Sequence, residues 1–96
     1  MPVFKGQGTG DIYSDWYNIP YKIISFYIVN PDNKEPFPSV TVYIQDIDEN
    51  DVLISAKNFV LKGGQAYVRD VITKVKKNER IHISTSHTID YYFSIE

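Results

Sequence analysis

The feature that most restricts the fold of this chain is the period of its apolar residues, which is two wherever a clear period exists. The stretch from Ser39 to Ile47 shows it best: one parity is apolar (Val40, Val42, Ile44) and the other is mixed (Thr41, Tyr43, Gln45). Such alternation is typical of a strand with one buried face. No longer segment has helical periodicity, so the sequence predicts a chain built from strands.

Composition supports this prediction. The 96 residues include thirteen Ile, nine Val, eight Tyr and five Phe, against two Ala, two Leu and one Met. β-Branched and aromatic side chains favour strands, whereas Ala, Leu and Met favour helices. A helical bundle and a βαβ fold are therefore disfavoured, and the length fits one domain.

Seven strands are expected, separated by turn-forming residues. They cover Asp11–Asn18, Tyr21–Asn30, Ser39–Ile47, Val52–Val60, Gln65–Thr73, Glu79–Ser86 and Thr88–Ile95. Short strands at this spacing predict a single antiparallel β-sandwich over residues 11–96, and jelly-roll and immunoglobulin-like wirings are both compatible with it. Residues 1–10 hold three glycines and no periodicity, so we expect a flexible N-terminal arm there.

Two strands carry further expectations. Tyr21–Asn30 is apolar on both parities, with Ile24 and Phe26 on one face, so it should be central or covered by a partner. After a short turn at Ser86-His87, the last strand should bury Phe93 and turn Tyr92 outward.

The sequence offers little support for chemistry. It has no cysteine, which excludes disulfides and thiolate chemistry. His82 and His87 are expected to face solvent, because Asp90 is the one further metal ligand close to them in sequence. Ser84 and Ser86 lie near His87 and Asp90, but no nucleophile elbow or oxyanion-forming turn accompanies them. We predict no catalytic residue, cofactor or metal site.

The acidic run at residues 46–51 resembles the start of an EF-hand loop, with Asp46, Asp48 and Asn50 at alternate positions. Asp51 stands where the loop needs glycine, and Lys57 stands where it needs the closing glutamate. The EF-hand interpretation therefore fails. A solvated acidic turn and a weak calcium site of another kind stay open.

Charge and hydropathy limit the partners. The net charge of −2 argues against nucleic acid. Residues 1–51 carry −5 and residues 52–96 carry +3, which is either scatter over loops or an aid to head-to-tail docking of identical subunits. No apolar region of secretory type follows the start, and no stretch approaches the roughly 20 residues that span a bilayer, so we expect no membrane partner.

The aromatic residues are the best candidates for contact with a partner. Tyr and Trp on outward parities are the types enriched at protein interfaces. The predicted contact residues are Phe4, Trp16, Tyr17, Tyr43 and Tyr92. Ordinary surface aromatics and a carbohydrate-stacking platform are the alternatives.

The order of strands and turns resembles that of small virion proteins of tailed bacteriophages. The shared pieces are Ile12-Tyr13 followed by Ile19-Pro20, Ile28-Val29-Asn30 followed by Val40–Ile44, and Lys62–Gly64 followed by Glu79-Arg80-Ile81, Ser84–Ser86 and Ile89–Glu96. The similarity covers residues 8–96 and consists of strand and turn patterns.

The resemblance implies a non-enzymatic auxiliary subunit of a phage head, neck or tail. Such a protein would be assembled in the host cytoplasm, reside in the virion, contact other virion proteins and form a homo-oligomer or symmetric array. A carbohydrate- or receptor-binding β-module and an intracellular β-sandwich adaptor are the alternative hypotheses.

Overall fold

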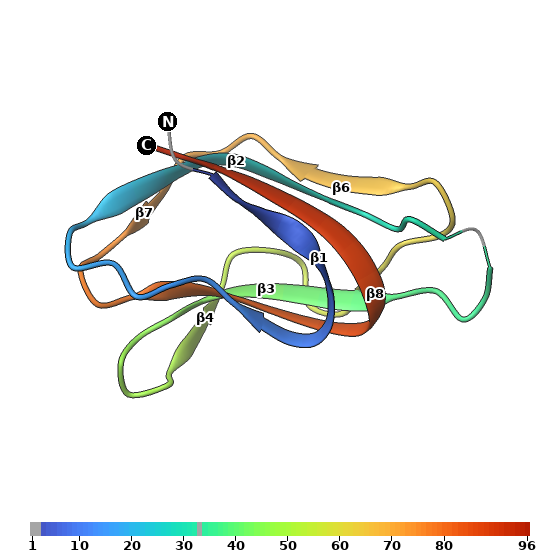
Figure 1. The fold of residues 1–96 in the computed structure, drawn as a ribbon, viewed down its shortest axis with the longest axis horizontal. Coiled ribbons are helices and arrows are strands. Elements are labelled where there is room, and N and C mark those ends of the chain that lie inside the picture. Colours follow the sequence, from blue (N-terminus) through green and yellow to red (C-terminus); the bar gives the residue numbers. More distant parts are fainter. Residues whose placement is uncertain (1–2, 33) are drawn as a thin grey trace.

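The structure is a computed structural model and describes residues 3–32 and 34–96. These ranges contain eight strands and no helix, and the strands form one curled antiparallel sheet, a half-barrel (Figure 1). The strands are β1 (Val3–Tyr13), β2 (Tyr21–Val29), β3 (Ser39–Gln45), β4 (Asp51–Leu53), β5 (Phe59–Val60), β6 (Ala66–Arg69), β7 (Thr73–Val75) and β8 (Arg80–Ile95). The all-β prediction is confirmed, but the seven-stranded sandwich is not. None of the described segments is a helix that could span a membrane.

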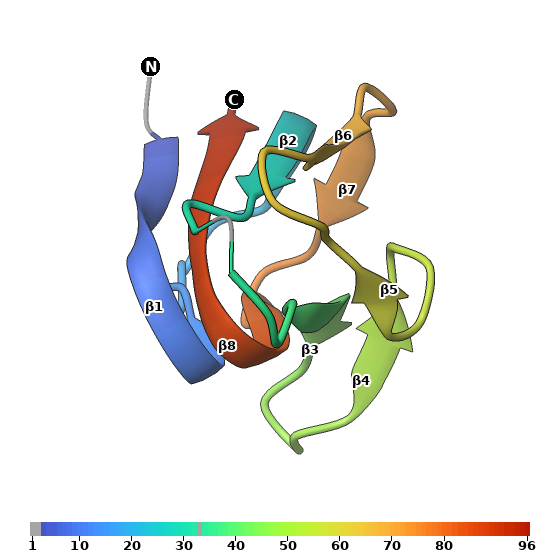
Figure 2. The same ribbon diagram turned by 90° about the vertical axis from the view of Figure 1, so that its right-hand side faces the viewer.

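The sixteen-residue strand β8 organises the sheet. Along one edge, its first part pairs with β3 and its last part with β2. Along the other edge, β1 follows it from end to end. The short strands extend the two halves, β4 and β5 beside β3, and β6 and β7 beside β2. Figure 2 shows β1 and β8 curving together along one side of the sheet, from the half that contains β3 to the half that contains β2.

The two final strands expected from the sequence are one bent strand. Gly8 of β1 lies opposite Ile89 and Gly10 lies opposite Thr85, so residues 86–88 of β8 face Thr9 alone. Extra residues in one strand bend and twist the pair. The predicted Ser86-His87 turn is thus a bulge, because continuous pairing with β1 carries the chain across it. Gly10 has φ of 78°, which glycine adopts without strain.

The concave side of the curl holds the core. Phe93 lies between Phe4 and Phe26, with ring centroids 5.6 and 4.6 Å away. The predicted inward residues of the third and last strands are buried, as are side chains from β2 and β7. The buried apolar set is Ile23, Phe26, Ile28, Val40, Val42, Ile44, Ile54, Leu61, Val75, Ile81, Ile83, Ile89, Phe93 and Ile95.

Strand β2 is central, as predicted, since β8 lies on one side of it and β6 and β7 on the other. The side chains of β2 do not alternate regularly between the two faces near Ile24, because the register with β8 shifts there. Ile23 therefore enters the core in place of Ile24. The opposite face carries Tyr27, which is 43% exposed. That face has no cover within the described part of the chain.

The expected N-terminal arm is wrong for the residues that the structure describes. Residues 3–10 belong to β1, and Met1 and Pro2 lie outside the described ranges. Strand β1 ends at Tyr13, so the first expected strand is placed several residues too late. Gly6 allows close packing between β1 and the neighbouring side chain of Tyr91. A Cβ added to Gly6 would lie 2.8 Å from the Tyr91 hydroxyl. A paired strand therefore replaces the arm.

The charge asymmetry of the sequence does not separate the ends of the molecule. The acidic turn between β3 and β4 and the basic residues after β7 both lie toward the left of Figure 1. The fold thus gives no support to docking between oppositely charged ends.

Deleting residues 1–9 should lower the melting temperature by roughly 10–20 °C, because β8 loses its partner and the core loses Phe4. Thermal unfolding followed by circular dichroism measures this. The matched control is Lys5→Ala, which keeps the strand and should change the melting temperature by less than about 3 °C. An unchanged melting temperature in the deletion would mean that β1 is dispensable.

Candidate functional site

The most highly organised polar cluster lies on the outer face of the sheet, around His82. In the cross-strand register, His82 of β8 stands opposite Tyr13 of β1 and Tyr43 of β3. Its ring stacks on both tyrosines, with centroids 4.6 and 5.2 Å away. His82 is therefore only 7% exposed, and the prediction that it faces solvent is wrong. The flanking tyrosines cover it although it points away from the core.

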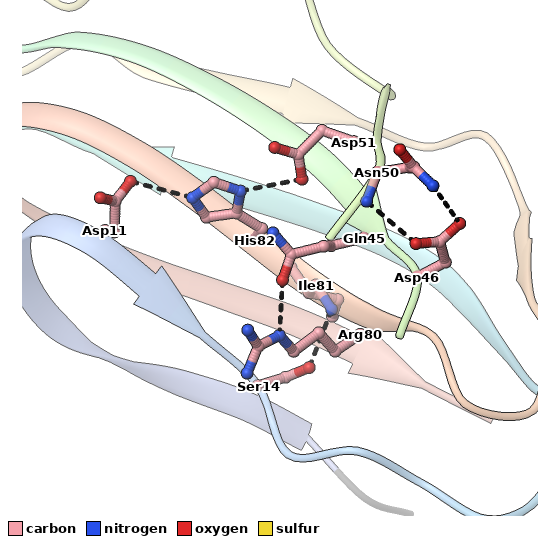
Figure 3. Close-up of polar contacts among 9 residues, drawn as sticks. All are labelled: Asp11, Ser14, Gln45, Asp46, Asn50, Asp51, Arg80, Ile81 and His82. Carbon is pink, nitrogen blue, oxygen red and sulfur yellow. Dashed lines mark hydrogen bonds and ion pairs between the residues drawn. The ribbon is translucent and has the colours of Figure 1, made fainter. Parts of the chain in front are cut away.

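Both ring nitrogens of His82 contact carboxylates (Figure 3). Nδ1 lies 3.0 Å from Oδ1 of Asp51, and Nε2 lies 2.9 Å from Oδ1 of Asp11. A neutral imidazole has one N–H, so only the imidazolium form donates to both carboxylates. The contacts link β1 and β4 to β8. They also occupy both nitrogens, so the ring offers none to a metal or a substrate in this arrangement.

Arg80 extends the stack. Its guanidinium carbon lies 4.0 Å from the Tyr13 ring centre and 4.2 Å from that of Trp16, and its Nε donates to Gln45 Oε1 at 2.9 Å. We call the continuous series of Trp16, Arg80, Tyr13, His82 and Tyr43 the aromatic ladder. Cation–π contacts of this kind contribute about 0.5–1 kcal/mol each at exposed sites.

The aromatic ladder holds its side chains in place while leaving part of them accessible. Trp16 is 42% exposed and Tyr13 is 41% exposed. Beside Tyr43, in register on β4, lies Leu53, which is also exposed. The ladder and Leu53 form an accessible aromatic and apolar row over β1, β8, β3 and β4.

The structure brings two of the predicted contact residues, Trp16 and Tyr43, into this ladder. The sequence interpretation missed Tyr13, Arg80 and His82 as members of it. The outward parity that marks Tyr43 also marks His82, so the parity was a usable signal. What the sequence lacked was the register that places the two rings side by side.

The remaining predicted contact residues lie elsewhere. Tyr17 packs edge-on against Tyr21, with centroids 4.9 Å apart. Phe4 contacts the core with Tyr91 and Phe93, not the outer face. Tyr92 points outward as predicted, on the other half of the sheet from the ladder.

Tyr92 forms a second outward aromatic pair with Tyr27. Their ring centroids are 5.2 Å apart and the ring planes differ by 6°. Lys5 stands opposite Tyr92 on β1, and the three side chains border an open hollow of about 590 Å³. This face is a flat aromatic platform.

Asp46, the first residue of the acidic turn, stabilises the turn through hydrogen bonds with later residues. The Asp46 carboxylate accepts hydrogen bonds from the backbone amides of Asp48 and Asn50, both at 2.9 Å, and from the Asn50 side chain at 3.2 Å (Figure 3). The backbone hydrogen bond from Asn50 is the largest cause that lowers the pKa of Asp46. In the described ranges, no three His, Asp or Glu side chains gather as a metal site would require.

The Ser and His residues near the bend do not form a triad. Ser86 Oγ lies 2.9 Å from His87 Nδ1, and it also accepts a hydrogen bond from the Ser39 amide at 2.8 Å. Asp90 instead accepts from Gln7 at 2.7 Å. The exposed position of His87 agrees with the prediction from sequence.

Tyr21 lies in a mostly apolar setting at the start of β2, beside an open pocket of about 380 Å³. Burial raises the pKa of Tyr21 to about 12. The Tyr21 hydroxyl is buried and makes no hydrogen bond within the described residues.

Comparison with known proteins finds no family model, no curated protein and no solved structure that matches the chain.

His82→Ala should lower the free energy of unfolding by about 2–3 kcal/mol, because its side-chain contacts with Asp11 and Asp51 and its stacking on two tyrosines are lost. Denaturant unfolding measures the change. His87→Ala, on the same strand but exposed, is the matched control and should cost less than about 0.5 kcal/mol. Equal losses in both variants would contradict a structural role for the His82 contacts.

Stability should fall between pH 10 and pH 12 as Tyr21 titrates. The folded state holds the phenol proton to about pH 12, whereas the unfolded chain releases it near the ordinary value of 10.0. The contribution of Tyr21 to folding stability is therefore fully present below pH 10 and is lost as pH rises through the folded pKa. Denaturant unfolding across this range should show a shallower decline in Tyr21→Phe. The decline should not vanish, because burial also raises the pKa of Tyr91. Identical declines would contradict the assignment to Tyr21.

Proposed function

We propose that this protein is a non-enzymatic structural subunit that works through protein–protein contacts, with the aromatic ladder as its principal contact face. The observation that carries the proposal is the partly exposed stack of Trp16, Arg80, Tyr13, His82 and Tyr43 across three strands. Trp, Tyr and Arg are the residue types that dominate binding energy in protein interfaces.

The ladder is also ordered before any partner arrives. Asp11 and Asp51 lie within hydrogen-bonding distance of the two ring nitrogens of His82, and the Gln45 side chain holds Arg80. Fixing a flexible side chain on binding costs about 0.5–1.5 kcal/mol, so a face that is already fixed avoids much of that cost. A rigid face suits repeated, identical contacts in an assembly.

The sequence resemblance provides the setting for this proposal: the virion of a tailed bacteriophage, as an auxiliary head, neck or tail subunit among other virion proteins. The support comes from the order of strand and turn motifs over residues 8–96 together with the ladder. Assembly would take place in the host cytoplasm, in a homo-oligomer or symmetric array.

Trp16 provides the test, because it is the only tryptophan in the chain and lies in the ladder. Purified phage particles that encode the chain should contain it, and Trp16→Ala should reduce its incorporation at least about tenfold while leaving the fold intact. Trp16 fluorescence should change when the neighbouring virion protein is added. Mass spectrometry of gradient-purified particles measures incorporation.

Ile19→Ala is the matched control, since Ile19 is an exposed apolar residue near Trp16 in sequence but outside the ladder. It should be incorporated like the parent. Absence of the parent chain from the particles would overturn the virion proposal. Equal incorporation of both variants would show that the ladder is not the contact face.

A carbohydrate-binding module is the second candidate function, favoured by the near-parallel pair of Tyr27 and Tyr92 on the opposite half of the sheet. Flat exposed aromatic pairs can stack on sugar rings, and Lys5 and Asp90 beside them offer charged groups that can hydrogen-bond to sugar hydroxyls. Glycan-array binding that is lost in Tyr27→Ala and kept in Trp16→Ala would favour this candidate over the first.

A further inference from the structure

Strand β1 has a free edge along its whole length. It pairs with β8 on one side, and its eleven residues have no pairing partner on the other side among the described strands. Figure 2 shows β1 at the left margin of the sheet, with no other labelled strand beyond it. A long exposed edge presents unpaired N–H and C=O groups, which is the template for addition of another strand.

The backbone groups on this edge belong to the odd-numbered residues. The Ser14 amide donates to the Ile81 carbonyl, so the even positions direct their hydrogen bonds toward β8. Backbone direction alternates with the side chains along a strand. Phe4, before the bend at Gly10, and Ile12, after it, both pack against the core, so the even side chains share one face at both ends of β1. The odd residues at both ends therefore direct their N–H and C=O groups outward.

The sequence of β1 is chemically symmetric about its central residue, Gly8. Residues at equal distances from Gly8 are matched in kind: Val3 with Tyr13, Phe4 with Ile12, Lys5 with Asp11, Gly6 with Gly10, and Gln7 with Thr9. Two antiparallel copies centred on Gly8 would pair all eleven residues. The only two charged side chains of β1 would then meet as opposite charges.

We propose that the free edge of β1 binds β1 of a second copy of this chain, antiparallel and with the two-fold axis at Gly8. The proposal builds on the assembly function proposed above by identifying one of its contacts. The interface is isologous, so each dimer contains two pairs of Lys5 with Asp11 of the second copy. The two half-barrels join into one continuous sheet.

The outer face of the joined strands carries the ion pairs. Asp11 uses Oδ1 to contact His82, and its other carboxylate oxygen makes no hydrogen bond in the described structure. That oxygen lies on a side chain that is 60% exposed and can receive the Lys5 ammonium of the second copy. Opposite charges in directly facing positions stabilise a pair of strands, and like charges destabilise it.

The inner face and the bend also suit this register. Phe4 and Ile12, both packed at the margin of the core, would contact each other across the axis and extend the core from one copy to the next. Gly10, where β1 bends, would face Gly6, so no side chain obstructs the strands at that point.

A cysteine scan tests the register of the two β1 strands. The chain has no native cysteine, so every disulfide that forms involves the introduced residue. Gly8→Cys places two thiols at the axis, in a facing pair close enough for a disulfide. The added Cβ would lie 3.0 Å from Cδ1 and 3.2 Å from Cγ1 of Ile12, so the Ile12 side chain must shift to another position. Gly8→Cys should form disulfide-linked dimers under mild oxidation at least about tenfold faster than Gln7→Cys and Thr9→Cys. Faster linkage at position 7 or 9, or none at the three positions, would overturn the proposal.

A charge exchange provides a second test that does not alter the glycine. Lys5→Glu and Asp11→Lys each convert both cross-strand pairs into like charges, so each should raise the dimer dissociation constant at least about tenfold in sedimentation experiments. Mixing the two variants should restore association, because the introduced glutamate of one copy then faces the introduced lysine of the other. Lys62→Glu, at an exposed turn, is the matched control and should behave as the parent.

The outcomes separate this inference from the proposed function. A parent protein that stays monomeric at every concentration overturns the β1 dimer, even when it is incorporated into virions through the aromatic ladder. A protein that forms the Gly8-centred dimer and is absent from virions supports the dimer and overturns the virion proposal. If β1 binds a strand of a different protein and no second copy, the second-copy assignment is wrong.

Discussion

The uninterrupted pairing of β1 with β8 is the interaction on which the rest of this structure depends. It carries β8 across the bulge at residues 86–88 and so keeps two half-sheets in one hydrogen-bonded unit. The bend turns β2 and β3 toward a common interior, where Phe93, Phe26 and the isoleucines pack. Without β1, the two halves of β8 would be joined only through the bulge.

The same strand register determines which side chains are neighbours on the outer face of the sheet. Because Tyr13, His82 and Tyr43 fall in one cross-strand row, the histidine is enclosed by aromatic rings on the side of the sheet that faces away from the core. Asp11 and Asp51 approach it from the two neighbouring edges. A buried polar side chain with both nitrogens satisfied stabilises a unique arrangement of strands, because a shift of one residue would separate all of these partners.

The two contact features have different physical characters. The aromatic ladder offers side chains that are fixed by stacking and by polar contacts, which suits a partner with a shaped surface. The edge of β1 offers backbone hydrogen bonds, which suit another strand whatever its side chains, with the charges setting the register. Together they let one small chain make two kinds of contact at once.

The all-β class, the central position of β2 and most of the core are predictable from the amino-acid sequence, because burial imposes a period of two that can be read locally at Val40, Val42 and Ile83. It also indicated the outward Tyr43 and named Trp16 as a contact candidate. Three features emerge only from the fold: residues 3–10 form an edge strand, Ser86-His87 lies in a bulge, and His82 is enclosed. Each of these depends on pairing between residues more than sixty positions apart, and no local pattern records which strands meet or in what register.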